Sequence, residues 1–414
     1  MSGAEPRIAI AGCGPAGLAT ALLLNRQGKN VTLLERFDEP RPIGSGLILQ
    51  PTGLAVLREL GLHRRIGALG RRIDRIHGQS MPSGKTVLDV NYSALGPGFH
   101  GIAVHRSALF DVLFDAVREA GIRVETSVAV QGLRRDGDTV QPLDEAGDTV
   151  GDFDLLIDAS GARSSLQSLS RGSLSRRELA YGALWGSFDW PGEPFVDSQL
   201  EQRYVDAHTM IGMLPIGTFA NFEQPQVAFF WSLKTRDYPA WLGNGLDAWK
   251  EQVLRIWPET EPVLDQIHDP DQLTLARYGH CTLAPPFGDG VVFIGDAAHS
   301  TSPQLGQGAN MALLDAWVLA CCLDRHSAAR AMVAYARARR WHIRAFQFSS
   351  LAMTPFYQSD SVILARVRDA LFDPVSRIPI ARRIVAGLIS GLLASPPKDL
   401  DYAGLFAEGF DWKQ

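Results

Sequence analysis

Three glycines near the start of the chain have the spacing of a phosphate-binding turn. In "GCGPAG", Gly12, Gly14 and Gly17 follow the apolar run "RIAIAG" and precede leucines and alanines at helical spacing. The first glycine permits a tight turn, the second lets a pyrophosphate approach the backbone, and the third lets the helix pack on the strand. Glu35 ends the next apolar run, at about the 20-residue distance from which an acid binds ribose hydroxyls. The pattern predicts a dinucleotide site for FAD or NAD, because an acid at this position would repel the 2′-phosphate of NADP.

A second segment rich in glycine and small polar residues, "VVFIGDAAHSTSPQLGQGAN", runs from Val291 to Asn310. Its strand-like start ends at Asp296, where a carboxylate can accept hydrogen bonds from a polyol chain. The glycines that follow let backbone N–H groups approach a planar ring, at the positive end of the next helix. Because the two motifs lie far apart in the sequence, one long ligand is expected to reach both. We interpret this as favouring FAD over NAD.

The elements that must hold these residues follow from periodicity. "RIAIAG", the helix after it and "NVTLLE" form a strand, helix, strand unit with parallel strands. "HRSALFDVLFDAVREAG" is an amphipathic helix, and several strands lead from it to the buried run "FDLLIDA". Aromatic-rich alternating segments between 179 and 283 predict an antiparallel sheet over a cavity or core.

The fold class we expect is mixed α/β. It comprises a discontinuous Rossmann-like domain (1–77, 100–178 and 284–340), an antiparallel β-sheet substrate domain (78–99 and 179–283) and a helical C-terminal region (341–414).

Composition excludes several classes of protein. The formal net charge of −5 gives no basic footprint, so nucleic-acid binding is not expected. The ten histidines and four cysteines show no ligand spacing, so no metal site is expected. We interpret the cysteines as reduced residues of a cytoplasmic protein, and the N-terminus as having no signal peptide. "IVAGLISGLLA" (384–394) is shorter than the ~20 residues that span a bilayer. We interpret this segment as a packed C-terminal helix, with a membrane-surface contact as the alternative.

The segment "GDAAHSTSPQLGQGANMALLDAWVLA" resembles an FAD-binding signature of the flavin-dependent aromatic hydroxylases, the group A monooxygenases typified by para-hydroxybenzoate hydroxylase. "GSGLILQPTGLAVLRELGL" and "HRSALFDVL" are also similar to stretches of that family. The resemblance implies that Pro303 borders the flavin where oxygen reacts, and that His299 is structural. It implies FAD contacts from Gly12, Gly14, Pro15, Ala16, Gly17, Glu35, Arg36, Arg106, Asp296, Pro303, Gly306, Gln307, Gly308 and Asn310.

One loop departs from the family pattern. Ser160-Gly161 stands where the family has Asp-Gly, and Gln167 stands where it has an arginine associated with FAD and the pyridine nucleotide. This leaves open whether electrons come from NADPH, from NADH or from a separate flavin reductase. The same loop resembles that of geranylgeranyl reductases and flavin halogenases, although no W-x-W-x-I-P segment is present.

The function implied is an FAD-dependent monooxygenase acting through a flavin C4a-hydroperoxide. It would use O2 and NAD(P)H to hydroxylate or epoxidise an apolar aromatic or polycyclic substrate. A flavin-dependent C=C reductase, an oxygenase fed by a separate reductase and a flavin-bound regulatory module are the alternatives. The apolar C-terminal third could pack a homodimer or the core.

Substrate contacts are expected from the aromatic-rich domain and from the cofactor side. The candidates, each of which could equally be core, are Gln50, Trp185, Tyr204, Met213, Phe229, Trp231 and Pro303. If a phenol must be deprotonated, His77, His208 or Tyr204 could act as the base.

Overall fold

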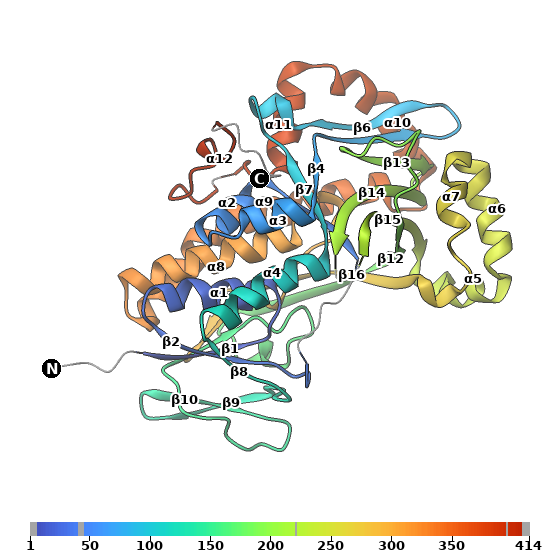
Figure 1. The fold of residues 1–414 in the computed structure, drawn as a ribbon. Helices are drawn as coiled ribbons and strands as arrows, with labels where there is room; N and C mark the ends of the chain where they lie inside the picture. The colour runs from blue at the N-terminus through green and yellow to red at the C-terminus, as the bar shows by residue number, and fades with distance from the viewer. Residues whose placement is uncertain (1–5, 40–44, 220–221, 395, 408–414) are drawn as a thin grey trace.

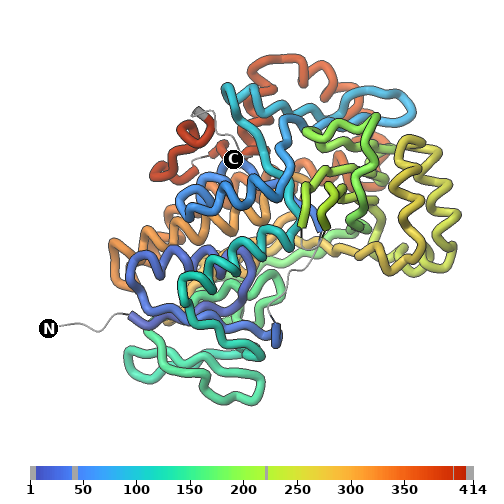
Figure 2. Tube along the Cα trace, in the orientation of Figure 1, coloured from blue at the N-terminus to red at the C-terminus, as the bar shows by residue number. Residues whose placement is uncertain are grey.

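The computed structural model describes residues 6–39, 45–219, 222–394 and 396–407. Figure 1 shows helices lying over a parallel sheet in one half of the molecule and a large, mostly antiparallel sheet in the other. The tube in Figure 2 shows how the blue N-terminal segments lie beside the orange helices of the C-terminal half. Segments far apart in the sequence therefore share one layer.

The parallel sheet contains the first predicted strand, helix, strand unit. β1 (Arg7–Ala11) pairs in parallel with both β2 (Asn30–Leu34) and β11 (Leu155–Asp158). The order is completed by β8 (Arg123–Glu125) beside β2, and by β18 (Val291–Phe293) and antiparallel β17 (Phe287–Gly288) beyond β11. The strands are apolar on both faces because both faces are covered.

Three helices cover one face of this sheet. α1 (Pro15–Arg26) lies against both α4 (Arg106–Glu119) and α8 (Gly308–Arg325). The opposite face packs against the hairpin of β9 (Gly132–Asp136) and β10 (Thr139–Leu143). The predicted helix at 105–121 and the strands after it are confirmed.

A three-stranded sheet links the two halves. β7 (Gly101–His105) lies between β3 (Gly46–Leu49) and β4 (Arg71–Ile73). The connecting helices are α2 (Pro51–Glu59) and α3 (His63–Leu69).

The large sheet is built mainly from the aromatic-rich segment. In spatial order its strands are β19 (His299–Ser300), β16 (Thr274–Ala284), β12 (Ser173–Asp189), β15 (Phe222–Lys234), β14 (Thr209–Phe219), β13 (Gln199–Val205), β5 (Arg75–Ser80) and β6 (Lys85–Asn91). Neighbours are antiparallel except β13 and β5, which run in parallel. On this topology we propose the same domains as before, with the sheet beginning at Arg75 and Ser173 rather than at 78 and 179.

Helices that the sequence analysis did not anticipate cover the outer face of this sheet. They are α5 (Tyr238–Asn244), α6 (Leu246–Ile256) and α7 (Glu261–Leu264), at the edge of the molecule in Figure 1. Trp249 and Val253 of α6 are buried against the sheet. The aromatic-rich segment therefore supplies a core of its own.

The chain ends in further helices: α9 (Ala328–Tyr357), α10 (Val362–Ser376), α11 (Pro379–Ile389) and α12 (Gly404–Ala407). α9 is continuous, so the boundary expected after residue 340 falls inside a helix. Within the described ranges, every helix is too short or too polar to cross a lipid bilayer.

Candidate active site

The two glycine motifs meet at one edge of the parallel sheet. β1, β11 and β18 are neighbours, and Gly12, Ser160 and Gly295 come just after their carboxyl ends. A Cβ built at Gly295 would lie 3.2 Å from the Cβ of Ala16. Residues of both motifs are therefore in contact, at the edge where open α/β sheets bind ligands.

The three N-terminal glycines serve three purposes. Gly12 has φ +102°, and a Cβ there would meet the carbonyl oxygen of Ala159 at 2.7 Å. A Cβ at Gly17 would overlap the carbonyl oxygen of Gly12, whereas a Cβ at Gly14 would meet nothing within 4 Å. α1 has no side-chain cap and no acid in its first turn. Open space beside uncapped N–H groups fits a pyrophosphate.

Glu35 is held beside this turn. One carboxylate oxygen accepts the Cys13 N–H at 2.8 Å, and the other accepts the Phe37 N–H at 3.2 Å. Burial and then the Glu35 charge raise the pKa of Cys13 to about 12, so its thiol stays protonated. Glu35 keeps acceptor capacity for ribose hydroxyls. Arg36 is exposed, and its guanidinium lies over the Phe37 ring.

Asp296 lies in the short 3-10 turn Gly295–Ala297 just after β18 and lines a pocket. Its side chain remains accessible to solvent although protein atoms crowd around it, as at the wall of a recess. Burial raises the pKa of Asp296, and the nearby charges of His299 and Arg106 oppose that rise. Arg106 is exposed at the first position of α4. The structure thus brings these two predicted cofactor residues together.

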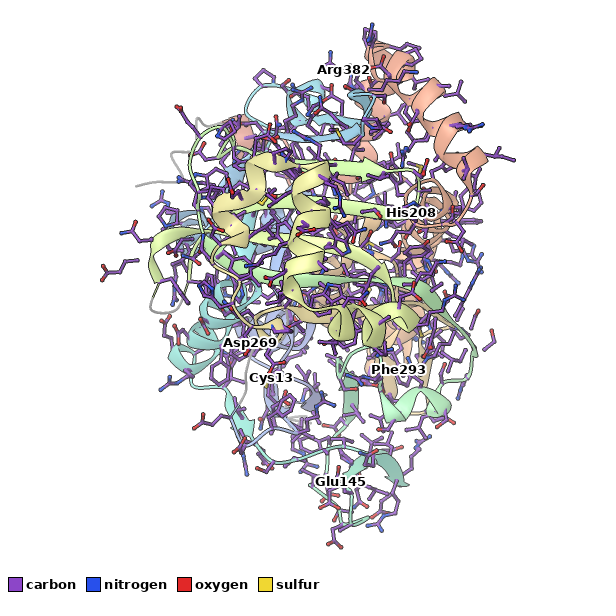
Figure 3. The ribbon with its side chains drawn as sticks, turned by 90° about the vertical axis from the view of Figure 1, so that its right-hand side faces the viewer. Cys13, Glu145, His208, Asp269, Phe293 and Arg382 are labelled. Carbon is purple, nitrogen blue, oxygen red and sulfur yellow. The ribbon has the colours of Figure 1, made fainter. Side chains whose placement is uncertain are left out.

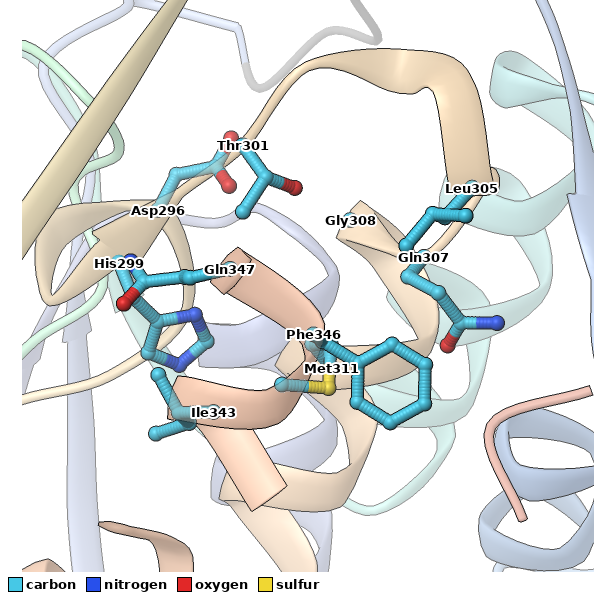
Figure 4. A pocket seen from close by; sticks show the side chains of 10 residues that line it. All are labelled: Asp296, His299, Thr301, Leu305, Gln307, Gly308, Met311, Ile343, Phe346 and Gln347. Carbon is cyan, nitrogen blue, oxygen red and sulfur yellow. The ribbon is translucent and has the colours of Figure 1, made fainter. Parts of the chain in front are cut away.

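Figure 4 shows this pocket between the second motif and α9. Its wall carries the Asp296 carboxylate and Thr301 on one side and the start of α8 on another. The lining residues are Asp296, His299, Thr301, Leu305, Gln307, Gly308, Met311, Ile343, Phe346 and Gln347.

Hydrogen bonds of two buried side chains hold the loop before α8 in place. The Asn310 side chain accepts the Gln50 N–H at 2.8 Å and donates to the carbonyls of Ile48 and Gly306, each at 3.0 Å. Gln307 donates to the carbonyl of Ile389 at 2.5 Å. These two amides therefore hold the loop.

The other side of this loop exposes backbone that no side chain covers. Gly306 has φ +59°, and a Cβ at Gly308 would meet nothing within 4 Å. Both glycines are exposed, and α8 begins without a side-chain cap. Pro303 is half-buried, and its neighbour Ser302 bonds to Ser350 and Thr354 of α9. A flat ring can approach this backbone, as the glycine pattern predicts.

A buried ion network that the sequence did not reveal lies below the loop. Asp315 binds His299 at 2.6 Å, Arg339 at 2.7 Å and the N–H of Gly295 at 2.8 Å. Burial alone would raise the pKa of Asp315, but His299 and Arg339 hold it well below its usual range. His299 thus has a partner that explains a structural role.

The unusual loop after β11 also has its own partners. The Asp158 carboxylate accepts from Ser160 N–H at 2.9 Å, from the Ser160 hydroxyl at 2.6 Å and from Ser164. Gln167 donates to the carbonyl of Ala297 at 2.8 Å and accepts from Arg176 at 2.7 Å. An arginine of β12 is therefore bonded to the residue that stands where the resemblance leads us to expect one.

The inner face of the large sheet turns toward the cofactor motifs. Trp185 packs on Phe230 with ring centroids 4.4 Å apart, and its indole N–H donates to the Tyr278 hydroxyl at 2.8 Å. Burial raises the pKa of Tyr278 to about 12, against the Trp185 hydrogen bond and the Arg106 charge. Gln50 is buried on the cofactor side, where it accepts from Tyr92 at 2.7 Å. Sequence reasoning missed Phe230 and Tyr278.

Three substrate candidates lie on the wrong face. Met213, Phe229 and Trp231 are buried in the cluster under α6, and both aromatic rings contact Trp249 edge-on, at 6.1 and 6.2 Å. Alternation along β15 turns Phe230 inward and its two neighbours outward. The prediction that these three line the cavity is wrong.

The proposed bases do not converge on the site. Tyr204 is buried and donates to Gln202 at 3.0 Å, and burial raises its pKa well above the usual range, which opposes a role as a base. His208 sits in a turn, bonded to Thr209 at 2.8 Å and apart from Cys13 in Figure 3. Burial and Arg75 lower the pKa of His77. The roles of the two histidines stay predictions.

The described residues contain no group of three or more His, Cys, Asp or Glu side chains that could hold a metal ion.

The fold and the site define a dinucleotide-binding flavoprotein with a large, mostly antiparallel sheet attached. A family model described as "FAD binding domain" matches residues 5–347, and the chain belongs to that family. It is an FAD-dependent monooxygenase that binds FAD.

The chain is 28% identical over 333 residues to 3-amino-4-hydroxybenzoate 2-monooxygenase of Streptomyces cremeus, covering 77% of this chain and 78% of the relative. It is 29% identical over 330 residues to 6-methylpretetramide 4-monooxygenase of Streptomyces rimosus, covering 76% and 74%. The structure of Klebsiella pneumoniae HpxO with FAD and uric acid is similar in fold, with a TM-score of 0.79, 20% identity and coverage of 94% and 97%.

Proposed function

We propose that this monooxygenase hydroxylates or epoxidises an apolar aromatic or polycyclic substrate, with electrons from NAD(P)H. A chain of contacts carries the proposal: Trp185 bonds to Tyr278, and the charge of Arg106 acts on both Tyr278 and Asp296. The aromatic inner face therefore adjoins the cofactor motifs. Two relatives, named for a hydroxybenzoate and for a pretetramide, support an aromatic substrate.

The residues fit FAD in order along its length. Gly14 and the start of α1 would hold the pyrophosphate, with Glu35 on the ribose and Arg106 nearby. Asp296 would bind the ribityl chain, and the exposed backbone at Gly308 would border the flavin ring. Bound and reduced FAD would supply the activation of oxygen for its transfer to the substrate.

The inner face has a positioning task. Trp185 and Phe230 would stack on an aromatic substrate and exclude water from the reacting atoms. The Tyr278 phenol stays protonated at neutral pH, so its hydrogen can be donated to a substrate oxygen. Electrophilic oxygen transfer needs few catalytic side chains, in keeping with an inner face that binds and orients.

The electron donor is tested by rapid mixing of anaerobic holoprotein with NADPH or NADH, with and without aromatic compounds. Substrate-stimulated bleaching of oxidised flavin supports direct use of the nucleotide. If neither nucleotide bleaches the flavin but a reduced flavin reductase restores turnover, the NAD(P)H part of the proposal fails and electrons come from a second protein.

We also propose a cytoplasmic location. Cys13, Cys281, Cys321 and Cys322 are free, as expected in a reducing compartment. Labelling of all these thiols after denaturation, without prior reduction, is the expected result.

A further inference from the structure

α10 turns its apolar side outward. Ile363, Val367, Leu371 and Val375 recur every fourth residue and are 73%, 37%, 53% and 41% exposed. The only residue of the helix that is both apolar and buried is Ala365, on the side that packs against β6. A helix that merely covered a core would show the reverse pattern.

α11 contacts α10 and also exposes apolar side chains. Ile380 and Ile384, also four residues apart, are 71% and 52% exposed, while Ala386 and Ile389 face inward. We call the combined surface the α10–α11 apolar face. Its residues are Val362, Ile363, Val367, Leu371, Val375, Ile378, Ile380 and Ile384.

Arginines lie on both helices that carry this face, although one of them, Arg368, is buried. Residues 362–389 contain five arginines and two aspartates, hence a formal charge of +3, within a chain whose net charge is −5. Asp369 is bonded to Arg368 and Ser80, and Asp373 to Arg377. Arg366 and Arg383 are exposed, and Figure 3 shows Arg382 at the rim of the molecule.

We propose that the α10–α11 apolar face docks on an anionic lipid bilayer. Short helices with apolar side chains on one side and arginines around them bind at the boundary of headgroups and acyl chains. A second copy of the chain suits the face less well, because a two-fold contact would set the same arginines against each other. Charge complementarity therefore selects lipid phosphates.

The docking face is tied to the active site. Ile389, at the end of α11, accepts the hydrogen bond from Gln307 in the loop before α8. α9 carries the pocket residues Ile343 and Phe346, and two residues later the exposed Phe348. An apolar substrate dissolved in the bilayer would thus enter a site held at the membrane surface. This entry route rests on the proposed function, whereas the docking itself does not.

Vesicle flotation of the holoprotein tests the proposal. Vesicles of phosphatidylglycerol and phosphatidylcholine should bind the protein, with at least tenfold weaker binding to phosphatidylcholine alone and weaker binding at high salt. Ile363→Asp with Ile380→Asp should abolish flotation, and Arg382→Glu with Arg383→Glu should weaken it about tenfold. Leu242→Asp, on exposed α5, is the matched control and should float as the parent does.

Two results would overturn the docking. One is failure of the parent holoprotein to bind the anionic vesicles. The other is a dimer, measured by light scattering, that Ile363→Asp with Ile380→Asp dissociates while this variant floats as the parent does. Substrate-stimulated NAD(P)H oxidation without vesicles, measured in parallel, reports on the proposed function alone.

Discussion

Three buried or recessed carboxylates near the cofactor motifs have different surroundings. Asp315 is neutralised by His299 and Arg339, and Asp158 accepts from Ser160 and Ser164. Asp296 instead reaches the pocket wall, where solvent can touch it. Asp296 is therefore the carboxylate among them that a ligand can bind.

Replacing Asp315 should be costly at neutral pH. Asp315→Asn leaves Arg339 and His299 without their partner, and loss of one member of a buried ion pair costs about 3–5 kcal/mol. The folded pKa of Asp315 lies below its ordinary value of 3.8, so its contribution is complete above that value and is lost as pH falls through the folded pKa. Urea unfolding at about pH 7 and about pH 3 should show the gap between variant and parent shrinking at the lower pH. An unchanged gap would contradict the ion network.

Substitution by alanine should have different effects at Gly14 and at Gly17, two glycines of the same motif. Gly14→Ala adds a Cβ into the open space where the pyrophosphate is expected, so FAD should bind roughly tenfold more weakly while the apoprotein keeps its stability. Gly17→Ala forces a Cβ onto the Gly12 carbonyl and should cost about 1–3 kcal/mol of apoprotein stability. Flavin fluorescence titration and thermal unfolding separate the two effects. Equal effects on both quantities would refute the distinction.

Gln167 holds the turn that carries Asp296. Gln167→Ala removes the donor to the Ala297 carbonyl and the acceptor for Arg176, so FAD affinity should fall about five- to tenfold. Arg176→Ala should act in the same direction but less strongly. Arg177→Ala, also exposed on β12, is the control. If all three variants bind FAD like the parent, Gln167 has no positioning role.

Among the larger elements, the two faces of the antiparallel sheet have separate tasks. The inner face carries Trp185 beside the cofactor motifs, and the outer face carries Trp231 under α6. Trp185→Ala should raise KM about tenfold, whereas Trp231→Ala should cost about 3–5 kcal/mol of stability without changing KM. Steady-state kinetics and urea unfolding of both variants test this. A raised KM in the Trp231 variant alone would reverse the assignment of faces.

Sequence reasoning located the strands around the motifs but could not decide the faces of this sheet. Gly12, Gly14 and Glu35 occupy a short local unit whose spacing fixes its geometry. In "AFFW" the residues on both faces are apolar, because helices cover one side and the cofactor domain lies on the other. The alternation along the strand then does not indicate which side chains point toward the cofactor domain. The sequence analysis therefore names Phe229 and Trp231 as substrate contacts instead of Phe230. Likewise, no local sequence pattern could predict that Arg176 bonds to Gln167 or that Asp315 bonds to His299.

Taken as a whole, the molecule assembles its cofactor site from remote segments. Gly14, Glu35 and Asp296 come just after strands of the parallel sheet, and Arg106 and Gly308 begin the helices α4 and α8 that pack beside α1. FAD bound there would stabilise the folded state by about 2.7 kcal/mol at a concentration one hundred times its Kd. Thermal unfolding of apoprotein and holoprotein should show this as a higher Tm with FAD. Equal Tm values at saturating FAD would contradict a site shared by these segments.

The most direct test of the proposed function is oxygen labelling. Compounds that stimulate NAD(P)H oxidation are incubated with the holoprotein under 18O2. The masses of the products are then measured by mass spectrometry. The proposal predicts a single labelled oxygen atom in the product, taken from O2 and not from water. An unlabelled product that also forms without oxygen would show reduction of the substrate and contradict it.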